Sequence, residues 1–371
     1  MKDRECIDTL QALRCLAFLG VFLCHTCLPG MESLGWGGVS IFLVISGFVM
    51  TYSYYGGNRV TSILIGDNIK FAYNKIKKLY PLYALTTVFL ALLYFVGRDT
   101  APVGSTLLRL GLNLLFVQEY TLHNTSINGP AWFMCAIVLF YFLFPWILKM
   151  MENNYSKRKA VMGIVIGLIM DLIIGLIGST FDSMSYGVDL TWRFVYFFPL
   201  SRIWDAFIGC NLGYLYLNRK REYSKRICTV LEIVSIICFI GVNVIYYLMN
   251  SKLMAGYVNS TDVWWIHSLL FIVSSIMLVY IFSIGKGGIA NALVSKITLY
   301  LAKISPYAYL LHYAVFKVVS MVFYHLPGVN DEIGLMLDRQ YGSWVKLTVG
   351  FAITVILSEL WIRISKLKQH K

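Results

Sequence analysis

The sequence predicts an all-α fold: a polytopic membrane helical bundle of about ten transmembrane helices plus one re-entrant or interfacial segment. Three observations predict this fold class. The chain of 371 residues is 58% hydrophobic and only 14% charged, whereas a soluble domain carries about 25% charged residues. Apolar stretches of about 20 residues, the length that crosses a hydrocarbon core of about 30 Å, recur from end to end. The basic residues gather in short segments between these stretches.

Ten apolar stretches are long enough to be membrane spans. They are residues 7–28, 36–54, 79–97, 130–150, 160–180, 194–217, 227–249, 263–283, 299–323 and 344–364. The first is interrupted by Arg14 and is followed by no small-residue cleavage site, so we expect it to be retained as a span. Because the connections are short, residues 1–371 are expected to form one integral membrane domain with no separate soluble domain.

An eleventh apolar run, 104–120, is shorter and carries three polar residues, Arg109, Asn113 and Gln118. If this run does not cross and the N-terminus is cytoplasmic, every strongly basic segment falls inside, as the positive-inside rule requires. These segments are 70–78, 149–159, 219–226, 286–296 and the tail 366–371. We therefore expect ten crossings, both termini in the cytoplasm, and residues 104–120 re-entrant or at the interface.

The charge and cysteine patterns exclude other classes of protein. A net charge of +13 would suggest nucleic acid in a soluble protein, but here the basic residues flank membrane spans, so no nucleic-acid partner is expected. Eight cysteines are scattered singly except for Cys24 and Cys27. A lone pair at this spacing on a transmembrane helix is weak evidence for a metal, so packing is favoured and no metal is expected.

Ionisable residues within the spans are the candidates for a functional site. Each costs about 2.5–3.5 kcal/mol to insert, so those present usually face the bundle interior. The set consists of Arg14, His25, Asp171, Arg202, Asp205, His312, Lys317 and Glu359.

Arg14 and His25 are predicted to share one face of the first span. They are 11 residues apart, which is about three helical turns and about 16 Å. Arginine offers a permanently charged fork of donors to phosphate or carbonyl oxygens, and histidine can accept and return a proton near neutral pH. The pair suits a thioester donor from the cytoplasm and a hydroxyl acceptor from outside. An arginine paired with an internal carboxylate and a histidine bonded to a backbone carbonyl is an equally open alternative.

Two further charged features can each be interpreted in two ways. Arg202 and Asp205, three residues apart, can meet on one helix face as a structural salt bridge or as catalytic groups. The segment 70–78 can set the topology, or attract the phosphates of a cytosolic nucleotide-bearing donor.

Several sequence motifs, in order along the chain, resemble those of the acyltransferase-3 family of integral membrane acyltransferases. These are Ile7–Arg14 followed by His25, Gly38–Phe48, Lys75–Tyr83, Ala131–Phe133 with Pro145, Pro199–Gly209, Ser305–His312 and Glu359. The sequence departs from the family pattern at a few positions: serine replaces aspartate at Ser40, lysines replace arginines at 75–78, Ile137 stands where a glutamate is common, and Asp205 replaces a glutamate.

The resemblance implies transfer of an acetyl group from cytosolic acetyl-CoA to a carbohydrate hydroxyl on the extracytoplasmic side of a bacterial plasma (inner) membrane. It marks His25 as the catalytic base, assisted by Arg14. Acetyl-CoA is then expected as co-substrate, with its phosphates or pantetheine near Arg14, Lys75, Lys77 and Lys78. Candidate oxyanion donors are Ser46, Ser305 and Tyr309. Further polar residues with a substrate-binding or structural role are Arg202, Asp205, His312 and Glu359.

Other functions stay open at this point. Direct transfer and a two-step route through an acyl-enzyme use the same residues. An acyltransferase with an amine or lipid acceptor shares every argument above. A carrier or flippase for a lipid-linked saccharide, using Arg14, Arg202 and Asp171 along a polar path, is the alternative outside enzymes, although the chain shows no internal repeat of the kind found in transporters.

Overall fold

The computed structural model describes residues 5–57, 60, 62–96, 103–121, 125–183, 188–220, 222–249, 260–324 and 331–367, and within these ranges the regular structure is entirely helical. The first half contains α1 (Asp8–His25), α2 (Glu32–Tyr54), α3 (Ile65–Ile76), α4 (Tyr80–Val96), α5 (Val103–Leu114), the 3₁₀ turns η1 (Gln118–Thr121) and η2 (Gly129–Ala131), α6 (Trp132–Glu152) and α7 (Lys157–Ser183).

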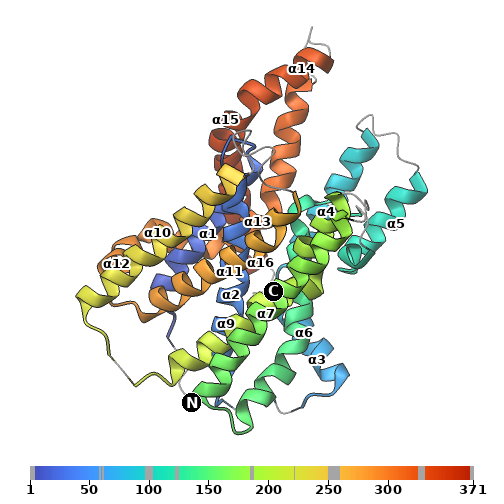
Figure 1. Ribbon diagram of the computed structural model, residues 1–371. Helices are drawn as coiled ribbons and strands as arrows, with labels where there is room; N and C mark the ends of the chain where they lie inside the picture. Colours follow the sequence, from blue (N-terminus) through green and yellow to red (C-terminus); the bar gives the residue numbers. More distant parts are fainter. Residues whose placement is uncertain are drawn as a thin grey trace.

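The second half contains α8 (Val188–Trp192), a π-helical turn η3 (Arg193–Phe197), α9 (Pro199–Leu217), α10 (Lys225–Met249), α11 (Ser260–Ile284), α12 (Gly288–Leu293) and α13 (Lys296–Tyr324). The last stretch runs through α14 (Asp331–Leu337), η4 (Asp338–Gly342), α15 (Ser343–Val345), η5 (Lys346–Gly350) and α16 (Phe351–Leu367), where η4 and η5 are π-helical. Figure 1 shows these helices as one bundle. The all-helical prediction is confirmed.

Each of the ten expected spans coincides with a helix, but fewer qualify as membrane crossings. In the described part of the chain, seven helices are long and apolar enough, or eight if α3 and α4, bent by 73° at their junction, count as one span. The apolar part described for α11 is shorter, Leu269–Ile284. The polar side chains of α9, among them Arg202, Asp205 and Asn211, explain why α9 is not among the seven. The count of about ten is therefore not confirmed.

Helices α1, α2 and α9 form the centre of the bundle. Of the most apolar window of α2, 83% is buried, against 22% for α10, which lies at the periphery. Glycines allow the closest approaches: Gly47 and Gly209 let α2 and α9 touch through their backbones, and Gly38 does the same for α2 and α1. A helix surrounded by others does not face lipid, so α9 can carry polar residues.

The segment 104–120 does not cross as a helix. Its helix α5 has 12 residues, about 18 Å, which is too short for a hydrocarbon core of about 30 Å. Buried Asn113 ties it down, since its side chain donates to the Thr125 carbonyl at 2.7 Å and accepts from the Ile127 amide at 3.2 Å. The Tyr83 hydroxyl of α4 donates to the Asn113 carbonyl.

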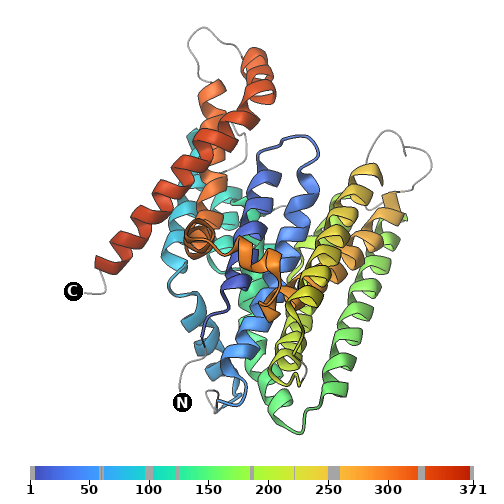
Figure 2. The same ribbon diagram turned by 90° about the vertical axis from the view of Figure 1, so that its left-hand side faces the viewer.

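The ends of the helices separate into two sides. The start of α1, helix α3 and the α6–α7 connection lie at one end of the bundle, and the α1–α2 connection and α14 lie at the other (Figures 1 and 2). The first end holds the basic segments 70–78 and 149–159. Residues 250–259 and 325–330, which belong to the connections 250–262 and 324–343 between expected spans, lie outside the described residues.

Candidate active site

Two histidines meet between the end of α1 and the middle of α13. The ring centroids of His25 and His312 are 5.0 Å apart in an edge-to-face arrangement. His25 Nδ1 is 2.8 Å from the Val21 carbonyl, and His312 Nδ1 is 2.7 Å from the Tyr309 carbonyl. Because a carbonyl only accepts, both Nδ1 atoms carry the proton, which leaves each Nε2 with a lone pair. His312 Nε2 is buried and has no partner among the described residues.

Aromatic rings hold the two imidazoles in place. Phe22, Phe316 and Tyr309 surround His312 with centroid distances of 6.1, 5.7 and 5.7 Å. On the other side, the Tyr313 ring lies 6.5 Å from that of His25. The helix periodicity of α13 puts 309, 312, 313 and 316 on one face, so a single helix supplies most of this wall.

A cavity of about 180 Å³ lies beside Arg14, towards the start of α1. Arg14 is half-buried and lines it together with Lys75, and Tyr141 of α6 forms part of the same wall. Among the described residues, no carboxylate pairs with Arg14 and no acceptor bonds to it. The alternative of an arginine neutralised by an internal carboxylate is therefore not observed, whereas His25 does have the expected backbone carbonyl partner.

The Arg14 cavity extends along α13 towards the histidines. Ser46, Ser305 and Tyr309 also line it, and the Tyr309 ring is next to His312. Both Arg14 and His25 face residues 305–313 of α13, so the shared face predicted from their spacing is confirmed.

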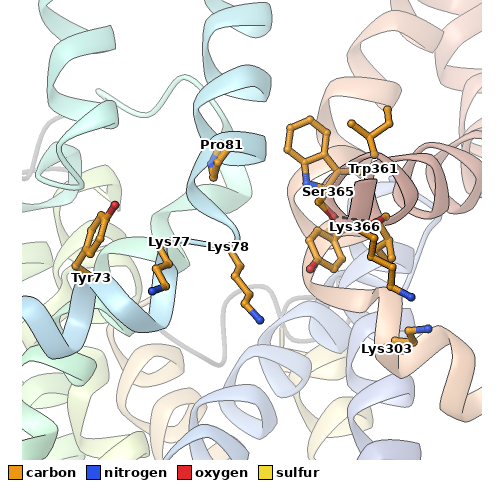
Figure 3. Close-up of a pocket in the computed structure, with 11 residues that line it drawn as sticks. Tyr73, Lys77, Lys78, Pro81, Lys303, Trp361, Ser365 and Lys366 are labelled. Atoms are coloured by element: carbon orange, nitrogen blue, oxygen red, sulfur yellow. Dashed lines mark hydrogen bonds between the residues drawn. The ribbon is translucent and has the colours of Figure 1, made fainter. Parts of the chain in front are cut away.

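A second pocket, of about 610 Å³, lies on the other side of the α3–α4 corner. We call it the lysine pocket, because Lys77 and Lys78 lie on one side and Lys303 and Lys366 on the other (Figure 3). Neighbouring residues line the two spaces: Lys78 precedes Leu79 of the Arg14 cavity, and Tyr307 follows its Pro306. The expected cofactor-binding residues thus divide between two adjoining spaces, with Lys75 beside Arg14.

The three candidate oxyanion donors already donate their hydroxyl protons elsewhere. Ser46 donates to the Phe42 carbonyl at 2.7 Å, and Ser305 to the Ala302 carbonyl at 2.9 Å. The Tyr309 hydroxyl donates to the Pro130 carbonyl at 2.8 Å. These residues line the cavity without offering a free proton to it in this conformation.

Arg202 and Asp205 form a salt bridge within the bundle. Arg202 Nη2 is 2.7 Å from Asp205 Oδ2 and donates to the Ser40 hydroxyl at 2.9 Å. Asp171 of α7 is buried close by. The pair joins α9 to α2 and does not line the Arg14 cavity.

Glu359 lies away from the Arg14 cavity, on α16. It pairs with Arg363 at 2.9 Å and accepts from Tyr300 at 3.3 Å. Glu359 is therefore not part of the site that contains the two histidines.

Sequence reasoning missed several residues of these spaces, namely Tyr141, Lys303, Tyr307 and Trp361. Lys303 lies near the start of the span 299–323, where a lysine suggests only a membrane boundary. No pattern in the sequence links it to residues 77 and 78.

Comparison with known proteins decides the family. The acyltransferase 3 family model, described as an acyltransferase domain, matches residues 7–360. The chain belongs to this family. It is also 31% identical over 169 residues to the acyltransferase MdmB of Streptomyces mycarofaciens, a match that covers 41% of this chain and 42% of that relative. No solved structure gives a significant match.

The family membership and the apolar helices make this chain a multi-pass membrane acyltransferase. As a member of the family it must bring an acyl donor and an acceptor together within the bundle. The chain matches less than half of the length of MdmB, so that relative adds support for acyl transfer only.

Proposed function

We propose that this acyltransferase moves an acetyl group from cytosolic acetyl-CoA to a hydroxyl of an extracytoplasmic or lipid-linked saccharide. The observation that carries the proposal is the arrangement on α1. Arg14, without an ion-pair partner among the described residues, lines a cavity near one end, and His25, with Nε2 available, lies at the other. A donor with an anionic part and a thioester at opposite ends suits two groups about 16 Å apart.

His25 acts as the general base in this proposal. Its Nε2 takes the proton of the sugar hydroxyl while that oxygen attacks the thioester carbonyl carbon. The carbon–sulfur bond then breaks, and His25 returns the proton to the leaving thiolate, so that free CoA and an acetyl ester are released. In a two-step route the acetyl group would first rest on the protein, and the same base would serve both halves.

His312 is a positioning residue for His25. The two rings pack edge to face at 5.0 Å. The hydrogen bond that His25 Nδ1–H donates to the Val21 carbonyl fixes the tautomer of His25, so its Nε2 stays the basic atom. Removal of the His312 ring would let the His25 ring rotate out of this orientation.

In this proposal both termini lie in the cytoplasm, which the charges support, and the membrane is the plasma (inner) membrane, which the family resemblance implies. Helix α3, which carries most of the basic segment 70–78, lies at the end of the bundle where α1 begins (Figure 2), and Lys77 and Lys78 of the lysine pocket directly follow it. Under the positive-inside rule this end is cytoplasmic, so acetyl-CoA enters where it is made. His25 then lies nearer the outer side, where the saccharide arrives.

The test follows labelled acetyl groups. Membranes with the wild type, His25→Ala or Cys27→Ser receive acetyl-CoA labelled on the acetyl group, and label in extracted saccharide is counted at equal protein level. His25→Ala is expected to lose at least about 100-fold in rate, since general-base catalysis contributes 10²–10⁴-fold. Cys27→Ser, an exposed change two residues away, is the control and should stay within about twofold.

Two other outcomes would contradict the proposal, and one would decide between its two routes. Transfer by His25→Ala at the wild-type rate would remove the proposed base. Label that stays on the purified protein without acceptor would replace direct transfer by the two-step route. A folded protein that neither binds CoA nor transfers label would favour the carrier for a lipid-linked saccharide instead.

A further inference from the structure

Lys317 of α13 is an ionisable residue within a span to which the proposed mechanism gives no role. Its ammonium nitrogen lies 5.4 Å from the centroid of the Tyr313 ring, within the range of a cation–π contact. Within the part of the chain that the structure describes, no carboxylate pairs with Lys317 and no acceptor bonds to it. A charge at a membrane span is costly when it has no counter-ion, so this ammonium calls for an anion.

The Lys317 side chain is directed towards the histidines. Lys317 is 21 residues after Lys296, the first residue of α13, which is about 31 Å along the helix. It therefore lies near the far boundary of a hydrocarbon core of about 30 Å, on the part of α13 that leads to α14 (Figures 1 and 2). A lysine at such a boundary usually extends its ammonium outwards to water. Here the ammonium contacts Tyr313, one turn back towards the bilayer centre.

The Tyr313 ring links Lys317 to the proposed base. Its centroid is 6.5 Å from that of His25, and the rings meet edge to face. Gly129 leaves room for the Tyr313 ring, because a Cβ there would lie 3.2 Å from Tyr313 Cζ, closer than the usual contact of about 3.5 Å. A ligand held by Lys317 is therefore a neighbour of His25, on the side of the histidines opposite to the Arg14 cavity along α13.

A buried amide beside this ring adds a second feature that calls for a ligand. Asn128 precedes Gly129, and its Nδ2 donates to the Leu310 carbonyl of α13 at 3.3 Å. Its Oδ1 is buried and has no hydrogen-bond partner among the described residues. Leu310 and Tyr313 are three residues apart and share a face of α13. Because buried acceptors are normally satisfied, this wall suits a ligand that has hydroxyl donors as well as a negative charge.

We propose that Lys317, Tyr313 and Asn128 form an acceptor subsite for an acidic saccharide, which places a carboxylate or phosphate at Lys317 and a hydroxyl at His25. This inference rests on the proposed function and names its acceptor class. Lysine carries a compact positive charge that binds either anion. An amine acceptor, which is cationic near neutral pH, would be repelled by Lys317, so the subsite also favours a hydroxyl acceptor over an amine.

An anionic phospholipid headgroup has the same charge and is the competing source. A lysine at the membrane boundary can bind such a headgroup without any role in acyl transfer. The two sources differ in one measurable respect: a headgroup site acts only when anionic lipid is present, whereas an acceptor subsite acts in a neutral bilayer as well.

The experiment supplies two classes of acceptor to matched variants. Lys317→Gln removes the charge, and Lys317→Arg keeps it. The control, Lys296→Gln, removes an exposed lysine at the other end of the same helix. Each purified protein is placed in phosphatidylcholine vesicles with acetyl-CoA labelled on the acetyl group. Saccharide extracted from the host membranes is separated by anion exchange into an anionic and a neutral fraction, and each fraction is added over a range of concentrations.

The wild type should label the anionic fraction, and Lys317→Gln should raise the KM for that fraction by about 10-fold to 100-fold, the usual weight of a hydrogen bond to a charged group. Lys317→Arg should stay within about threefold of the wild type, and Lys296→Gln should not change this KM. The KM for acetyl-CoA should stay within about twofold in all variants, which also shows that they fold. A Lys317→Gln variant with the wild-type KM for the anionic fraction, or an equal loss in Lys296→Gln, would overturn the subsite.

The same assay separates the inference from its premise. Label in the neutral fraction alone would leave the proposed function standing and overturn the subsite, whereas no labelled saccharide from the wild type would overturn the proposed function itself. An effect of Lys317→Gln that appears only after phosphatidylglycerol is added to the vesicles would assign Lys317 to lipid headgroups and overturn the subsite. Mild acid then identifies the anion of the labelled product, because it releases a neutral saccharide from a lipid-linked phosphate but leaves the carboxylate of an acidic sugar in place; either anion supports the proposal.

Discussion

Gly47 on α2 lies directly against the backbone of α9, and adding one methyl group there should destabilise the protein strongly. A Cβ at Gly47 would lie 1.8 Å from the carbonyl oxygen of Ala206 and 2.8 Å from the backbone nitrogen of Cys210 on α9. Non-bonded heavy atoms need about 3.5 Å. Because both partners are backbone atoms, no side-chain rotation relieves the clash, and the two helices must separate by about 1.5 Å.

The size of the effect follows from overpacking. Extra methyl groups in a well-packed core usually cost about 1–3 kcal/mol, and a clash with backbone belongs at the upper end. At about 2 °C per kcal/mol, the lower end of the scale for large domains, Gly47→Ala should lower the unfolding temperature of the detergent-purified protein by about 6 °C. The cavity wall formed by Ile45 and Ser46 moves with it, so the rate of acyl transfer should fall as well.

A second glycine provides the control. Gly241 lies in α10, and a Cβ there would meet nothing within 4 Å. Gly241→Ala should leave the unfolding temperature unchanged or raise it slightly, because alanine favours the helix by up to about 1 kcal/mol. Equal unfolding temperatures for the two variants would refute the argument that α2 and α9 depend on this contact.

Two other changes test the electrostatics of the bundle by thermal unfolding. Asp205→Ala leaves the Arg202 guanidinium, only 4% exposed, without its ion-pair partner and should lower the free energy of unfolding by about 3–5 kcal/mol. The double variant Arg202→Met/Asp205→Leu should recover much of this stability. An Asp205→Ala variant as stable as the wild type would contradict a structural salt bridge. Burial raises the pKa of Glu119 above its ordinary value of 4.5, against the opposing effects of the Ser126 hydroxyl and Arg193. The folded carboxyl thus holds its proton more tightly than the unfolded one, so its stabilisation is complete below pH 4.5 and is lost as the pH rises through the folded pKa. Glu119→Gln should therefore unfold at a higher temperature than the wild type at pH 7 and at a similar temperature near pH 4, and a difference independent of pH would contradict this.

Hydrophobicity was sufficient to locate the helices but insufficient to count the crossings. A run of apolar residues predicts a helix wherever it occurs, so all ten stretches coincide with helices. The bend between α3 and α4 could not be predicted, because the amphipathic helix 65–76 contains two lysines, an aspartate and two asparagines and so does not appear as part of a span. The start of α9 at Pro199, later than the expected 194, follows from the π-helical turn before it, which the sequence pattern does not show.

The site could be predicted only where it lies on one helix. Arg14 and His25 share α1, so the helical repeat alone places them on a common face. His312 was a candidate, but its contact with His25 depends on how α13 packs against α1, nearly 300 residues later in the chain. The serines illustrate a different limit: a serine on an apolar helix satisfies its hydroxyl with a carbonyl three or four residues back, so Ser46 and Ser305 line the cavity without donating into it.

Because Arg14 and His25 lie on a single helix, α1 determines the distance between them. The Arg14 guanidinium lies near one end of the helix and the His25 imidazole at the other, and the number of residues between them fixes their separation. Substitutions along α1 change which atoms face the neighbouring helices without altering this length. The gain or loss of one residue would shift the separation by 1.5 Å and rotate one end by about 100° away from α13. In the proposed mechanism, the reach of the donor is thus set by a count of residues, independent of the identity of most of them.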